Sequence, residues 1–298
     1  MKKKFTITIA FCLGLFVGCT ADKRADFIVA CGEDKVLVID AKSSDGGQVN
    51  IVRRWQVTDS AAQLPVAYQQ YLPPINDCKP VDGNTKILLT GGSAVVLLER
   101  ETGKCLFYAR TPNSHSADWL PDNKVVVALS IAEGGNSLEV YDIRRPEQVL
   151  FRDSLYSGHG AVWIPERERF YALGFDELRE YSLKNWNTAS PELRLEKRWI
   201  LPEEDGHDLS PVSGGKLMVT ASKGVYLFDI MRETFTPFEP LKGIPGVKSV
   251  NYNEATGQLI YTKAEESWWT FNIYMKHPDR KLTLPDVRLY KVRLIYNL

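Results

Sequence analysis

The chain has 298 residues, of which 44% are hydrophobic and 25% are charged, with 37 basic and 37 acidic side chains. This composition is that of a globular protein rather than a disordered one, and the length is sufficient for a sizeable core. The formal net charge of zero argues against nucleic acid as a partner, because such a partner requires a surplus of Lys and Arg over a whole face.

The N-terminus has the organisation of an export signal. Three lysines at positions 2–4 precede an apolar run over 5–17, which is too short to span a bilayer as a resident helix, and Gly18 stands directly before Cys19. Residues 15–19 resemble the lipobox of bacterial lipoproteins, which implies cleavage before Cys19 and acylation of its thiol. The alternative is an ordinary secretory signal with a coincidental cysteine.

We therefore expect a signal peptide over 1–18, a lipidated linker over 19–25 and a folded domain over 26–298. The acyl chains on Cys19 would anchor the protein to a membrane of the cell envelope, the outer membrane being the expected one, with either of its sides open. Three cysteines then remain in the mature chain, at Cys31, Cys78 and Cys105. Their odd number and apolar surroundings favour buried thiols over a disulfide framework, and leave one bridge open.

Six short runs rich in β-branched and apolar residues recur along the chain. They occupy 27–30, 87–90, 125–128, 170–173, 217–220 and 259–262. Apart from a longer first interval, their starts lie 38 to 47 residues apart, close to the length of one four-stranded propeller blade. The period predicts six repeats of one β-sheet unit.

Further strands are expected within each unit. After nearly every run a tight turn leads into a second expected strand, at 36–40, 95–99, 138–142, 178–182, 225–229 and 287–291, and several of these strands alternate apolar with polar residues. Third strands are expected at 52–57, 106–109, 150–155 and 193–199. One short helix over 61–71 would account for the long first interval, and 265–286 is interpreted as an insertion in the last unit.

The fold class that this pattern predicts is all-β, a six-bladed β-propeller. The first unit lacks a leading strand and the last has little chain left, so we expect one terminus to complete the blade of the other, without being able to assign the strand. The competing fold is a β-sandwich with a second β domain, which the regular period disfavours.

Polar residues recur ten or eleven positions before the last five of the six runs, where the innermost strand of each blade would begin. They are Asp77, His115, His159, His207 and Lys248. The chain has 4 histidines, and three of them occupy the same slot in consecutive units. A propeller would bring these side chains together around one channel mouth.

Three interpretations of this polar ring are open. The side chains could bond to neighbouring blades and to water, holding the blades in register. They could instead bind a small polar ligand such as a carbohydrate, together with Lys79 and Asp208. In the third, His115, His159 and His207 bind a divalent metal that supports a lyase or hydrolase reaction.

Two adjacent tryptophans, Trp268 and Trp269, offer a stacking platform for a sugar ring, or alternatively pack over the closure of the propeller. The sequence contains no nucleophile elbow, phosphate-binding loop or zinc-protease motif. It therefore leaves open whether the protein is an enzyme, and we favour ligand binding by a monomer over a protein-interaction scaffold.

Several segments of the chain resemble an uncharacterised family of envelope lipoproteins from Bacteroides-like bacteria, whose members are six-bladed propellers. The resemblance covers residues from about 26 to the end and is carried by 77–79, 115–116, 158–160, 206–208, 247–249 and 268–269. It implies the propeller fold and an envelope location, and it implies no reaction. The histidines are also loosely similar to those of propeller enzymes such as oligogalacturonate lyases, whose channel-mouth histidines hold a divalent metal.

Overall fold

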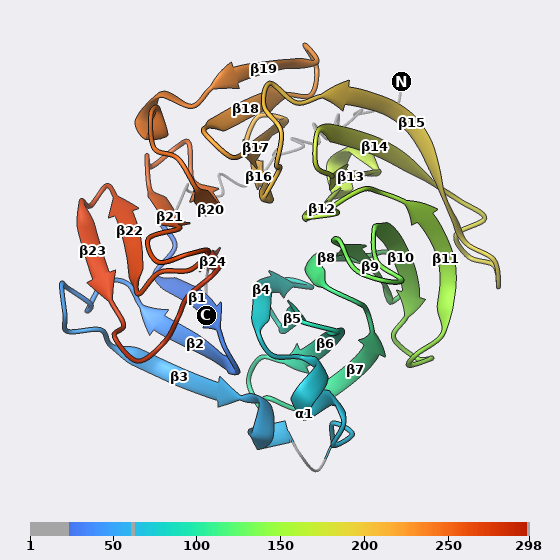
Figure 1. Ribbon diagram of the computed structural model, residues 1–298, viewed down its shortest axis with the longest axis horizontal. Helices are drawn as coiled ribbons and strands as arrows, with labels where there is room; N and C mark the ends of the chain where they lie inside the picture. Colours follow the sequence, from blue (N-terminus) through green and yellow to red (C-terminus); the bar gives the residue numbers. More distant parts are fainter. Residues whose placement is uncertain (1–23, 61–62, 297–298) are drawn as a thin grey trace, which may run out of the picture.

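Six four-stranded sheets stand around a common axis in the computed structural model, which describes residues 24–60 and 63–296 (Figure 1). All strand pairs within the sheets are antiparallel. The predicted six-bladed β-propeller is confirmed. Each sheet is called a blade, numbered from the N-terminus.

The blades share one order, with the innermost strand named first below. Blade 1 contains β24 (Val292–Ile295), β1 (Phe27–Gly32), β2 (Lys35–Asp40) and β3 (Ile51–Gln56). Blade 2 contains β4 (Ile75–Val81), β5 (Lys86–Gly91), β6 (Ala94–Glu99) and β7 (Cys105–Arg110). Blade 3 contains β8 (Ser114–Leu120), β9 (Lys124–Leu129), β10 (Ser137–Asp142) and β11 (Val149–Ser154).

The remaining blades follow the same plan. Blade 4 contains β12 (Gly160–Ile164), β13 (Arg169–Leu173), β14 (Glu177–Lys184) and β15 (Glu192–Ile200). Blade 5 contains β16 (Asp208–Val212), β17 (Lys216–Thr220), β18 (Val225–Asp229) and β19 (Thr234–Pro237). Blade 6 contains β20 (Val247–Tyr252), β21 (Leu259–Lys263), β22 (Asn272–Lys276) and β23 (Arg280–Thr283).

Counted outward from the axis, the six apolar runs of the sequence form the second strand of every blade. Their side chains are buried on both faces, because each sheet packs against two neighbours. Between blades 2 and 3, for example, Leu88 and Leu97 pack in one cluster with Val127 and Tyr141. Burial between neighbouring blades, rather than one central core, therefore holds the ring together.

The ring closes through the C-terminus. Strand β24 pairs with β1 in a register that places Ile295 opposite Phe27 and Val292 opposite Ala30. The last strand of the chain thus supplies the innermost strand of the first blade, which is the completion that the sequence predicted without assigning the strand. On the far side of β1, Gln258 fixes the start of the described chain, since its amide accepts from Ala25 N at 2.8 Å and donates to Ala25 O at 2.9 Å.

The last unit and the predicted helix differ from expectation. Segment 287–291 is not the second strand of the last unit but the approach to β24, and 265–286 is no insertion because it contains β22 and β23. Only Tyr68–Tyr71 forms an α-helix (α1) within the predicted 61–71, after a 3-10 turn at Val57–Ser60; two further 3-10 turns occupy Pro165–Arg167 and Glu239–Leu241. Residues 61–62 lie outside the described part of the chain.

The three expected thiols are free, with Cys31 and Cys78 buried and Cys105 partly buried. Within 24–60 and 63–296, no helix has the length and hydropathy needed to cross a membrane. The signal peptide and Cys19 lie outside the described residues.

Candidate functional site

Near the start of each innermost strand, one polar residue occupies an equivalent position in the strand register. We call this set the histidine mouth, and its members are Asn76, His115, His159, His207, Lys248 and Lys291. The strand register establishes their equivalence, because each directly precedes the residue that pairs with the fourth position of the apolar run. In blades 2, 3 and 6 the pairing shifts at this point, so Asn76, His115 and Lys248 are the extra residues of β-bulges.

One predicted member of this ring is displaced by a single position. Asp77 pairs with Thr90, and is equivalent to Ser116 and Asp208 rather than to the histidines. Asn76 takes the place that the sequence assigned to Asp77. The spacing along the sequence does not separate the two residues, because Asp77 lies ten and Asn76 eleven positions before the apolar run, and both spacings occur in the other blades.

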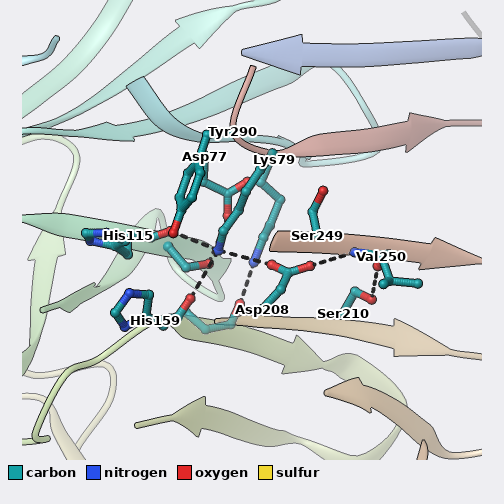
Figure 2. Close-up of polar contacts among 12 residues, drawn as sticks. Asp77, Lys79, His115, His159, Asp208, Ser210, Ser249, Val250 and Tyr290 are labelled. Carbon is teal, nitrogen blue, oxygen red and sulfur yellow. Dashed lines mark hydrogen bonds and ion pairs between the residues drawn. The ribbon is translucent and has the colours of Figure 1, made fainter. Parts of the chain in front are cut away.

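The three histidines of the mouth are brought together, as the sequence predicted. The ring centroids of His115 and His159 are 4.2 Å apart, and those of His159 and His207 are 5.5 Å apart. Figure 2 shows His115 and His159 side by side, next to Asp208. Residues of three successive blades therefore come together near one end of the axis.

Backbone carbonyls fix the protonation of two of these rings. Nδ1 of His115 lies 3.1 Å from Asn113 O, and Nδ1 of His159 lies 2.9 Å from Ser157 O. A carbonyl oxygen only accepts, so Nδ1 carries the proton and donates in both rings. Nε2 of each ring is then a bare acceptor, and neither Nε2 has a hydrogen-bond partner among the described residues.

Burial keeps the imidazoles neutral. It lowers the pKa of His115 to about 3 and the pKa of His159 well below its ordinary value, and the neighbouring Lys291 acts in the same direction on both. Burial also lowers the pKa of His207, against an opposing effect of Asp205. The mouth therefore presents uncharged imidazoles at neutral pH.

Lys248 and Asp205 meet at His207. Nε2 of His207 lies 2.8 Å from Lys248 Nζ and 3.1 Å from Asp205 Oδ2. The two contacts need opposite tautomers, because Nε2 either accepts from the ammonium group or donates to the carboxylate. Burial lowers the pKa of Lys248 to about 8, so the Lys248 side chain loses its positive charge slightly above neutral pH.

Trp268 and Trp269 have different surroundings. Trp268 is 43% exposed and meets the ring of Tyr290 edge-on at 5.4 Å, while Tyr290 in turn meets His115 at 6.0 Å. Trp268 thus extends the wall of the mouth outward. Trp269 instead packs edge-on against Phe271 and lies under the Arg288 guanidinium, a structural position.

Asp77 and Asp208 lie deeper and are not free to bind a ligand. Arg293 donates to both oxygens of Asp77 at 2.9 and 2.8 Å, and to both oxygens of Asp208 at 2.8 and 2.6 Å. Lys291 Nζ lies 3.1 Å from Asp208 Oδ1. The four side chains, which we call the axial plug, are at most 3% exposed.

The axial plug connects all six blades. Arg293 and Lys291 belong to blade 1, Asp77 to blade 2 and Asp208 to blade 5. Lys291 also donates to the carbonyls of His115 and His159 in blades 3 and 4, at 3.2 and 3.3 Å, and Val250 N of blade 6 donates to Asp208 at 3.2 Å (Figure 2). Although burial alone would raise the pKa of both carboxyls, the charges of Arg293 and Lys291 hold each pKa below its ordinary value. Asp77 and Asp208 therefore bond to neighbouring blades, which is the first of the three interpretations of the polar ring.

Arg293 and Lys291 are not among the site residues predicted from the sequence. The sequence pattern predicts that Lys291 belongs to the strand 287–291 of the last unit. It does not identify the strand that closes the ring and carries both residues to the axis. A signal was nevertheless present, since two buried carboxylates at the same level need cationic partners.

The other predicted residue, Lys79, lies beyond the plug, toward the far end of the channel, where it donates to Ala161 O and lies 3.8 Å from Asp118 Oδ2. Across the described ranges, no group of three or more His, Cys, Asp or Glu side chains is arranged to hold a metal ion. The three histidines therefore give the metal hypothesis no geometric support, and the predicted ligand set divides between the mouth, the plug and the far end.

Comparison with known proteins identifies a family of unknown function. One solved structure, "Dihydro-heme d1 dehydrogenase NirN in complex with DHE", is similar at 12% identity with a TM-score of 0.47, over 91% of this chain and 54% of that one. The chain thus spans about half the length of that protein. A search of the curated proteins gives no match. The model described as "Family of unknown function (DUF6528)" matches residues 23–297, and the chain therefore belongs to that family.

Proposed function

We propose that this protein binds a small, uncharged, hydroxyl-rich ligand at the histidine mouth, a carbohydrate being the foremost candidate. The observation that carries the proposal is the pair of bare Nε2 acceptors on His115 and His159. Neutral imidazoles accept hydrogen bonds from hydroxyl groups but offer no charge to a phosphate or carboxylate.

The surroundings of the two acceptors support the same ligand class. Lys248 supplies a donor at the mouth, so a hydroxyl group can donate to an imidazole and accept from the amine. Trp268, with its exposed face beside Tyr290, offers an apolar surface for the C–H face of a sugar ring. A few convergent polar groups beside an aromatic wall are typical of small-molecule sites.

The test is a screen of neutral mono- and disaccharides against the purified mature domain, followed by calorimetry on any binder. Trp268→Ala should weaken binding about ten-fold, and His115→Gln should weaken it as well. Met231→Ala, which removes another exposed apolar side chain on an outer turn, is the matched control and should bind as the wild type does. Absence of any binder in the screen, or equal affinity for the Trp268→Ala and Met231→Ala variants, would refute the proposal.

We also propose that the protein is an exported monomer, anchored in the envelope through acylated Cys19. The supporting feature is the lipobox-like sequence at 15–19. Growth with a radiolabelled fatty acid should label the wild type and not Cys19→Ser, which should appear in the soluble fraction. Unchanged labelling of the variant would contradict the anchor.

A further inference from the structure

The far end of the channel holds a cavity of about 270 Å³ on the axis. Every innermost strand contributes to its wall, through Lys79, Asp118, Trp163, Ser210, Asn251 and Leu294. Arg293 of the axial plug also lines it. This cavity and the histidine mouth are therefore on opposite sides of the plug.

A second cavity of about 560 Å³ continues from the first. Both are lined by Pro211, Tyr252 and Tyr296, so the two form one trough that runs outward from the axis. Its outer part lies along the turn at Pro165–Arg167 and the β16–β17 turn at 213–215. We call the combined feature the lower groove, and its elongated form fits a ligand longer than a single sugar ring.

The charges in the lower groove balance. Lys79 faces Asp118, Lys216 forms a 2.7 Å ion pair with Glu254, and Arg167 is next to Glu166 in sequence. Arg293 is already neutralised by two carboxylates. An uncharged ligand therefore suits the groove better than an anionic or cationic one.

Aromatic rings and hydrogen-bonding groups both line the wall. Trp163 and Tyr252 are partly exposed and Tyr296 is 37% exposed. Lys79 and Asp118 are 12% and 15% exposed at the side chain, and their heads are 3.8 Å apart, which is too long for a direct hydrogen bond. A hydroxyl group placed between them can donate to the carboxylate and accept from the amine.

We propose that the lower groove binds a linear, uncharged oligosaccharide, as a second site independent of the histidine mouth. The aromatic side chains would stack on successive sugar rings, and the Lys79 and Asp118 pair would hold a ring at the axis.

Calorimetry with neutral hexasaccharides of glucose and of N-acetylglucosamine, each compared with its monosaccharide, tests this site. One hexasaccharide should bind at least ten-fold more tightly than its monosaccharide. Tyr296→Ala, near the end of the chain, and Asp118→Asn should each remove most of that advantage, whereas Trp268→Ala should leave it intact. Circular dichroism identifies any variant that fails to fold, and Tyr296→Ala carries the least risk of that.

Three results would overturn the inference. They are equal affinity for hexasaccharide and monosaccharide, tighter binding of an acidic hexagalacturonide or of an unstructured hexapeptide, and a Tyr296→Ala variant that binds like the wild type. Because the mouth is tested with Trp268→Ala and the groove with Tyr296→Ala, failure of one site leaves the other standing.

Discussion

Arg293 binds two carboxylates that reach it from blades 2 and 5, and its side chain is almost completely buried. Replacing it with Met removes the cation and leaves Asp77 and Asp208 as buried charges, which Lys291 and, for Asp77, the more distant Lys79 compensate only in part. We expect a loss of about 3–5 kcal/mol in the free energy of unfolding, the usual cost of breaking a buried pair from one side. Urea unfolding followed by tryptophan fluorescence measures it.

Arg288→Met provides the matched control for that substitution. Arg288 is 53% exposed at the side chain and pairs with Glu33 at the surface, so its loss should change stability by less than about 1 kcal/mol. Combining Arg293→Met with Asp77→Asn and Asp208→Asn should recover part of the lost stability. Equal effects of the two arginine substitutions would contradict the account of the plug.

The neutral histidines predict a pH dependence of stability. Their pKa values are lower in the folded protein than the ordinary value near 6.5, so the unfolded chain binds more protons below that pH. Their contribution is complete above pH 6.5 and is lost as pH falls toward the folded pKa, which is about 3 for His115. The slope approaches about 1.4 kcal/mol per pH unit for each such histidine.

Urea unfolding between pH 4.5 and 7.5 tests this dependence. The free energy of unfolding should rise with pH up to about 6.5 and then level off, and His115→Gln should show a shallower rise. The plug carboxylates, whose pKa values are lowered, lose their contribution only at lower pH. Parallel curves for the variant and the wild type would show that His115 is not held neutral by the fold.

At the residue scale, recurrence along the chain was informative where the residue type itself recurs. His115, His159 and His207 could be placed together because three of four histidines share one slot. Arg293 and Lys291 could not, because their partners lie more than 80 residues away in sequence and only the ring closure brings them into contact. The repeat predicts which residues are equivalent, but not which ones pair across the axis.

At the scale of elements, the approach to β24 is tightly packed against β1. A Cβ added at Gly32 would lie 2.0 Å from the backbone oxygen of Arg288, an impossible contact unless one segment moves. Gly32→Ala should therefore destabilise the protein by about 1–3 kcal/mol, as overpacking does. Gly47→Ala, where nothing lies within 4 Å of the added Cβ, should have little effect in the same unfolding assay, and equal effects would contradict this packing.

The elements differed in how readily their sequences identified them. The second strands are almost entirely buried, for example Lys124–Leu129, so continuous apolar runs located all six. Innermost strands such as Ser114–Leu120 face the polar axis on one side, and their spacing from the apolar runs varies by one residue between blades, so the predicted register was wrong by one residue in blade 2. Strand Asn272–Lys276 has only two buried residues, and segment 287–291, which contains as many apolar residues, was predicted as the strand instead.

At the scale of the molecule, the two ends of the described chain lie beside each other in blade 1, because Ile295 pairs with Phe27. Joining residues 296 and 25 with a short glycine linker, and opening the chain in the exposed turn between Lys242 and Gly243, should preserve the ring. We expect the permuted protein to unfold cooperatively, with a free energy within about 2 kcal/mol of the wild type. A permuted protein that is unfolded or only partly structured would show that blade order along the chain, and not closure, determines the fold.

The hydrogen bonds between Ala25 and Gln258 have a consequence for orientation. They fix the start of the described chain beside Phe27 and Ile295, at the end of the ring that holds the lower groove. If Cys19 carries lipid as proposed, the intervening stretch is at most about 20 Å long when fully extended. The bilayer would then lie next to the lower groove, and the histidine mouth would face away from the bilayer. The lower groove would thus face sugars attached near the membrane, and the histidine mouth would face solutes that diffuse freely.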